Sequence, residues 1–159
     1  MDFPEHPFWD FALRVYRSPG VGAACLEVQE RLGIDVNVLL FCCWLGESGR
    51  GAVSPEILAQ ARDSVTTWHE SVVKHLRFVR RILKDGIASA PPELAQALRA
   101  QIQAREIDAE HIEQLMLAAS VASLGVSPSR PVDQRVGDAL ANIGAYLKTL
   151  DASATAGSF

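Results

Sequence analysis

Two charged side chains, Arg105 and Asp108, interrupt the apolar face of a helix predicted over residues 92–123. A charge on such a face is costly unless it is paired, and the i,i+3 spacing lets these two residues pair with each other. If this helix packs antiparallel against the helix before it, Arg105 lies near Trp68 and Asp108 lies beside His69. A cation–π contact and a carboxylate–imidazole hydrogen bond would then form in the interior. The arrangement fits a structural polar network, and it also fits a ligand-binding or catalytic pocket.

Five basic residues follow the side of the preceding helix that is opposite its apolar seam, namely Lys74, Arg77, Arg80, Arg81 and Lys84. In an antiparallel hairpin this stripe lies opposite Arg99 and Gln101. The acidic residues of the second helix are expected on its outer face, away from the stripe: Glu106, Glu110 and Glu113. The stripe is therefore predicted to bind an anionic ligand or an acidic partner, the alternative being an ordinary solvated face near a helix C-terminus.

Motifs for metals and cofactors are incomplete. Asp108-x-x-His111 supplies only half of the paired helical motif that carboxylate-bridged metal sites need. Gly20 and Gly22 open a helix but follow a helical pattern, whereas a dinucleotide-binding loop follows a strand. We therefore predict no metal and no cofactor, and no pattern identifies a catalytic residue or decides whether the protein is an enzyme.

The elements that must position these residues are all helical, because no segment shows sustained apolar–polar alternation between hairpin turns. Ser18-Pro19 and Ser54-Pro55 each give a helix cap followed by proline at the first helical position. The pattern predicts an all-α, compact and irregular bundle of about six helices. These helices are expected over about 7–17, 19–33, 35–46, 55–84, 92–123 and 133–150, and those at 55–84 and 92–123 form a long antiparallel hairpin.

Bulk properties favour one soluble domain. The chain has 159 residues, 48% of them hydrophobic, and a formal net charge of −4, which gives no general case for nucleic-acid binding. The longest unbroken apolar run, Val38–Leu45, is too short to cross a membrane. Asp2 and Glu5 stand where a secretory signal would carry basic residues, which favours a cytoplasmic location. We expect residues 1–150 to form a single domain and residues 151–159 to form a flexible tail.

Several short motifs occur together in the chain, namely Phe8-Trp9-x-Phe11, Pro19-Gly20-Val21, Ala24-Cys25-Leu26, Asp35-Val36-Asn37, LLFC, Trp44-Leu45, Trp68, Val72-Val73, Leu76-Arg77 and Arg80-Arg81. With these motifs the chain resembles a family of small bacterial proteins known only as a domain of unknown function, well over about residues 8–84 and loosely over 92–120. The resemblance implies a small helical cytosolic protein of a bacterium. It supplies no activity, cofactor or catalytic residue.

The same motif singles out polar positions that packing does not require. Asp35 is explained as a helix cap, but Asn37 in the next turn is not. One hypothesis is a cleft in which Tyr16, Asn37 and Arg77 converge near Trp44 and Trp68. The alternative is that Tyr16 and Asn37 only satisfy backbone groups where helices meet.

These observations favour a non-catalytic interaction protein that presents an apolar face and the basic stripe to a protein or anionic partner, with a homodimer as one form. The alternative is a small-molecule-binding protein or enzyme with a pocket between the first, third, fourth and fifth helices. The candidate pocket residues are Tyr16, Asn37, Trp68, His69, Arg77, Arg105 and Asp108.

Overall fold

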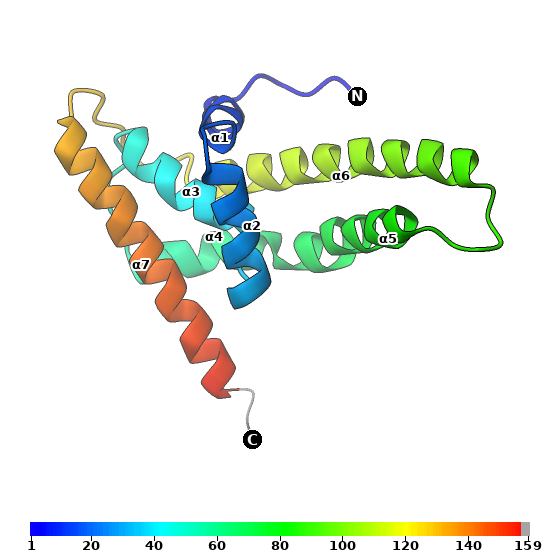
Figure 1. Cartoon of the computed structure of the whole chain (residues 1–159). Coiled ribbons are helices and arrows are strands. Elements are labelled where there is room, and N and C mark those ends of the chain that lie inside the picture. Colours follow the sequence, from blue (N-terminus) through cyan, green and yellow to red (C-terminus); the bar gives the residue numbers. More distant parts are fainter. Residues whose placement is uncertain (157–159) are drawn as a thin grey trace.

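The centre of the fold is α3 (Val36–Glu47), a helix that is apolar on nearly all sides. Its side chains Val38, Phe41 and Leu45 are completely buried, as expected for a helix enclosed by others. The Asp35 carboxylate caps the helix and accepts a hydrogen bond of 2.8 Å from the backbone N–H of Asn37. In the computed structural model (Figure 1), α3 is packed among α1 (Pro7–Tyr16), α6 (Pro92–Ser120) and α7 (Val132–Ala156).

Close approach of α7 to α3 depends on a small residue. A Cβ atom added at Gly46 would lie 2.5 Å from the backbone oxygen of Arg135 and would also clash with Ala139. Further along α7, Tyr146 is buried, and its hydroxyl oxygen accepts a 3.0 Å hydrogen bond from the backbone N–H of Asp35. The last helix therefore helps to fix the start of α3.

A continuous helix from Pro55 to Asp85 forms one arm of the hairpin, and α6 forms the other. It consists of α4 (Pro55–Trp68), a π-helical turn η1 (His69–Val73) and α5 (Lys74–Asp85). In Figure 1 the α5–α6 part of the hairpin projects away from the rest of the helices. With α2 (Val21–Leu32), the described residues form six continuous helical segments, so the predicted all-α fold and its long hairpin are confirmed.

The π-helical turn changes which side chains face inward. Sequence periodicity predicts one apolar seam through Trp68, Val72 and Val79. In the structure His69 and Val73 are buried instead, and Val79 is 40% exposed. A π turn inserts an extra residue into the helix and rotates the faces that follow it. The seam prediction was therefore wrong around the π turn and at Val79, whereas Leu83, at the end of the predicted seam, is buried.

The structure describes the backbone of residues 1–156 and the side chains of residues 1–150. Within this part no helix is long and apolar enough to cross a membrane. The predicted tail begins inside α7, whose backbone continues to Ala156, and its last three residues, 157–159, lie outside the described residues.

Candidate functional site

A cleft of about 510 Å³ opens between α1, α2, the start of α3, α5 and α6. Apolar side chains that include Trp9, Leu26 and Ile107 form part of its lining. Asn37 and Gln114 also line it, and both are buried. The charged lining comes from the C-cap of α1, the N-cap of α3, and from α5 and α6, namely Arg17, Asp35, Arg77, Arg80, Arg81, Glu106 and Glu110.

Four of these residues form an arginine cluster, defined as Arg77, Arg80, Glu106 and Glu110. The Arg77 guanidinium donates to Glu106 Oε1 at 3.0 Å, to Glu110 Oε1 at 2.8 Å and to Gln29 Oε1 at 3.2 Å. Arg80 also donates to both oxygens of Glu106. The prediction that this part of the basic stripe stays unneutralised is wrong, because Glu106 points into the hairpin rather than outward.

Electrostatics in the arginine cluster shift the pKa values of its two carboxylates in opposite directions. Burial alone would raise the pKa of Glu106, but hydrogen bonds from Arg80 and Arg77 outweigh it and lower the pKa. For Glu110 burial prevails over Arg77 and raises the pKa. The cluster therefore holds two cations and two carboxylates in near balance.

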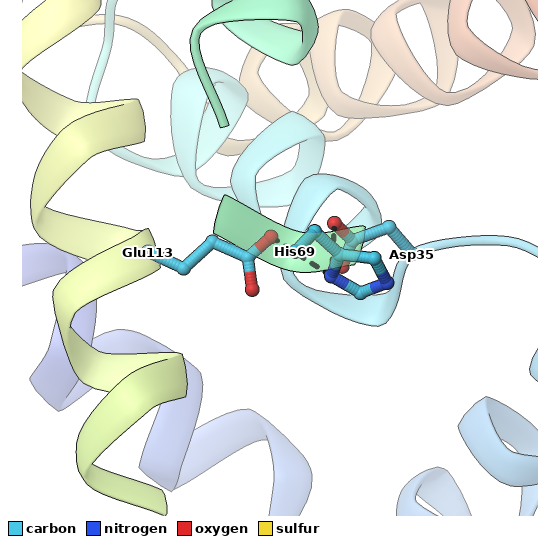
Figure 2. Close-up of side chains that lie close together, drawn as sticks. All are labelled: Asp35, His69 and Glu113. Carbon is cyan, nitrogen blue, oxygen red and sulfur yellow. Dashed lines mark hydrogen bonds and ion pairs between the residues drawn. The ribbon is translucent and has the colours of Figure 1, made fainter. Parts of the chain in front are cut away.

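Behind the cleft lies a second group, the His69 cluster, defined as Asp35, His69 and Glu113 (Figure 2). It joins three elements: the cap of α3, the first residue of η1 and the middle of α6. His69 Nδ1 lies 3.0 Å from Asp35 Oδ2 and 3.0 Å from Glu113 Oε1. The Glu113 side chain is completely buried, and His69 is 9% exposed. Two carboxylates thus share one imidazole nitrogen in the interior.

Asn37 orients both carboxylates of this cluster. Its backbone N–H donates to Asp35 Oδ1, and its side-chain amide donates to Glu113 Oε2 at 2.8 Å. Gln114 in turn donates to Asn37 Oδ1 at 2.9 Å. Because one oxygen of each carboxylate is held in this way, the other oxygen of each is left to face His69. These hydrogen bonds explain why an asparagine stands at position 37, which helix capping does not explain.

Protonation in the His69 cluster follows from burial and crowding. Burial and the nearby Glu113 carboxylate raise the pKa of Asp35 to about 8. Burial would also raise the pKa of Glu113, but hydrogen bonds from His69, Asp35 and Asn37 lower it. Burial opposes the charged form of His69, yet the two carboxylates raise its pKa overall. Burial and crowding therefore oppose simultaneous ionisation of the two carboxylates, and the effect is larger at Asp35.

The three donor atoms of the His69 cluster all lie within 4.8 Å of one another, which makes this cluster the group in the described part of the chain that could hold a metal ion. Asp108 and His111 of the half-motif Asp108-x-x-His111 are not part of such a group of donor atoms. His111 instead stacks on Trp9, with ring centroids 3.9 Å apart, and on Phe3.

The structure brings together the three polar residues of the predicted cleft. Tyr16, Asn37 and Arg77 all line the cleft, and His69 lies behind it. Trp44 lies elsewhere, stacked on Phe8 with ring centroids 5.1 Å apart.

The other predicted residues of the hairpin lie outside the cleft lining. Trp68 donates from its indole N–H to the backbone oxygen of Ala109 at 3.0 Å. The prediction that Arg105 is interior is wrong, since its side chain is 55% exposed and pairs with Asp108 at 2.8 Å on the surface of α6. Asp108 is accordingly not the partner of His69, whose partners are Asp35 and Glu113.

The remaining residues of the basic stripe are exposed. Lys74 pairs with Glu70 at 2.8 Å on the same helix. Lys84 lies exposed in the last turn of α5. Arg81 lines the cleft and forms no ion pair with any residue in the described range.

Sequence reasoning missed Glu113, Gln114 and the second role of Asp35. The spacing of Glu106, Glu113 and the buried Leu117 is compatible with one helix face, and this was the available signal. A helical wheel that assigns every glutamate to solvent cannot detect it, because buried carboxylates persist only where partners from other elements meet them.

Comparison with curated proteins and with solved structures gives no match. Residues 7–117 match the family described as protein of unknown function (DUF2390), which covers α1 to most of α6 and includes both clusters. The chain therefore belongs to this family.

Proposed function

We propose that the protein binds a small organic anion in the cleft between α1, α2, α5 and α6. The observation that carries the proposal is the combination of unpaired arginines and an unpaired buried amide oxygen in one cavity. Arg17 and Arg81 line the cleft and have no ion-pair partner in the part of the chain that the structure describes. The oxygen Oε1 of Gln114 is buried and has no hydrogen-bond partner there.

These groups define the chemistry of the ligand. Two free guanidinium groups favour a carboxylate or a phosphate, because arginine donates in a planar fork that matches both. A buried amide oxygen needs a donor, so the ligand carries a hydroxyl, amino or amide N–H group as well. Apolar walls that include Trp9, Leu26 and Ile107 suit a short hydrocarbon body between these ends.

The interaction-protein hypothesis stays a prediction. Two of its five basic residues, Arg77 and Arg80, are occupied by Glu106 and Glu110, and Lys74 is paired with Glu70. Fewer cationic side chains are therefore available to bind a partner, and the cleft is the better-supported alternative.

We also propose a location in the reducing cytoplasm of a bacterium. The free cysteines Cys25, Cys42 and Cys43 support a reducing compartment, in which thiols persist unpaired. The bacterial source is implied by the sequence resemblance.

Thermal-shift measurements with a panel of hydroxy acids, amino acids and sugar phosphates test the cleft. We expect at least one compound to raise the melting temperature of the full chain by several degrees. The Arg81→Gln variant should lose most of this shift, because it removes an unpaired cation from the cleft. Lys84→Gln is the matched control and should keep the shift, since Lys84 does not line the cleft. Failure of the whole panel to stabilise the protein, or equal shifts in both variants, would reject the proposal.

A further inference from the structure

We propose that the His69 cluster is a binding site for one divalent transition-metal ion, with Asp35 Oδ2, His69 Nδ1 and Glu113 Oε1 as ligands. This goes beyond the proposed ligand-binding cleft and does not depend on it, because the cluster stands on its own geometry. Figure 2 shows the three side chains converging from separate elements on one point.

The distances suit a metal ion. Both carboxylate oxygens lie 3.0 Å from His69 Nδ1. Ligands that bind a transition metal at about 2.0–2.2 Å lie about 3 Å from one another. The three side chains therefore need only small movements to surround an ion.

The supporting contacts are also those of a metal site. Ligating carboxylates in proteins are held by outer hydrogen bonds that fix their orientation. Asn37 supplies such bonds to both Asp35 Oδ1 and Glu113 Oε2, and Gln114 holds Asn37. The other oxygen of each carboxylate faces the imidazole.

The charges of the His69 cluster give a second reason to expect a metal ion there. Two carboxylates and one imidazole are buried together, and no lysine or arginine forms an ion pair with any of the three in the described residues. A dication with a neutral imidazole would neutralise the pair of carboxylates. The mixed oxygen and nitrogen donors suit Zn²⁺, Mn²⁺ or Fe²⁺, whereas Ca²⁺ and Mg²⁺ prefer oxygen alone.

The unsatisfied Gln114 oxygen, which a donor on the cleft ligand would satisfy, would equally accept from a group bound at the cluster. Gln114 Oε1 is an acceptor without a partner in the described part of the chain, and Gln114 is only 4% exposed. Gln114, Asn37 and Asp35 all line the cleft. Three protein ligands leave positions open on a metal ion, and a metal-bound water is a hydrogen-bond donor. Such a water, supplied from the cleft, is the kind of group that Gln114 Oε1 needs.

Calorimetric titration of the full chain with ZnCl₂ or MnCl₂ alone, after removal of metals with EDTA, tests this inference. We expect one equivalent to bind. Asp35→Asn should weaken binding at least tenfold while it preserves the cap of α3, since asparagine caps helices as well as aspartate does. His69→Gln should weaken binding to a similar extent.

Asp108→Asn and His75→Gln are matched controls on the same two hairpin helices, and they should bind the ion as the wild type does. Circular dichroism establishes that each variant is folded. Absence of stoichiometric binding by the folded wild type would overturn the site and leave a purely structural network. Equal binding by the wild type, Asp35→Asn and His69→Gln would overturn it as well, by placing the ion elsewhere. Neither result bears on the organic ligand, which the thermal-shift panel tests separately.

Discussion

The His69 cluster and the arginine cluster both join the arm that contains η1 and α5 to α6, but their charges are arranged differently. In the arginine cluster each carboxylate meets at least one guanidinium, and Glu106 meets two. In the His69 cluster two carboxylates meet a single imidazole. The first arrangement is complete with its own residues, which is typical of a structural ion-pair network. In the second no lysine or arginine pairs with either carboxylate in the described residues, so the two can ionise together only if a further cation joins them, as at a site that binds a metal ion.

Glu113→Ala should give the largest loss of stability. The substitution opens a cavity at a completely buried position, leaves the Asn37 amide without its acceptor and leaves His69 with Asp35 alone. We expect the free energy of unfolding to fall by about 3 kcal/mol. Urea denaturation of the metal-free protein measures it. The control is Glu70→Ala, an exposed pair that should cost less than about 1 kcal/mol. Equal losses in both variants would mean that the cluster is not part of the folded core.

Glu106→Gln should cost about 2 kcal/mol, because hydrogen bonds to charged groups are worth about 1.5–3 kcal/mol and this residue accepts from two arginines. Glu27→Gln, which changes an exposed pair with Arg31, is the matched control and should be nearly neutral. A neutral effect of Glu106→Gln in urea denaturation would remove the contrast between the two clusters.

Asp35→Asn should behave in the opposite way. It replaces one of two crowded carboxylates by a neutral group of the same shape and keeps the helix cap. We expect the metal-free variant to unfold with a free energy within about 1 kcal/mol of the wild type, or higher. A loss as large as that of Glu106→Gln would show that the ionised Asp35 stabilises the fold and that the His69 cluster is a second structural network.

The pH dependence of stability should show the smallest effect. Arg80 and Arg77 hold the folded pKa of Glu106 below its ordinary value of 4.5. The folded protein therefore binds fewer protons than the unfolded chain in this range, so the contribution of Glu106 is complete above pH 4.5 and is lost as pH falls through the lower folded pKa. The difference in unfolding free energy between wild type and Glu106→Gln should shrink from pH 6 to pH 3. A constant difference would contradict the paired geometry.

Most helix positions followed from local signals in the sequence, but Ser18-Pro19 does not begin a helix as predicted, because α2 starts at Val21 after Gly20. Asp35 and Ser54 are caps in the structure, and Pro55 and Pro92 each stand at the first turn of a helix. These signals act within one turn of the chain, so they are visible in a single sequence.

Side-chain facing in the hairpin followed only in part. His69 is in the interior beside carboxylates, as predicted, but these are Asp35 and Glu113 rather than Asp108. Periodicity gives no warning of the π turn over His69–Val73, which rotates the faces that follow it. Glu106 and Glu113 are inward because arginines, a histidine and an asparagine from other helices meet them. Arg105 was predicted inside on the assumption that the same α6 face is apolar throughout. Polar clusters of this kind are set by tertiary packing, which local pattern does not encode.

The most direct test of the metal site is a crystal structure of the protein grown with MnCl₂ or ZnCl₂, with anomalous diffraction data. We expect one strong anomalous peak about 2.0–2.3 Å from Asp35 Oδ2, His69 Nδ1 and Glu113 Oε1. A map with no peak at the His69 cluster, in crystals that contain the ion in solution, would contradict it.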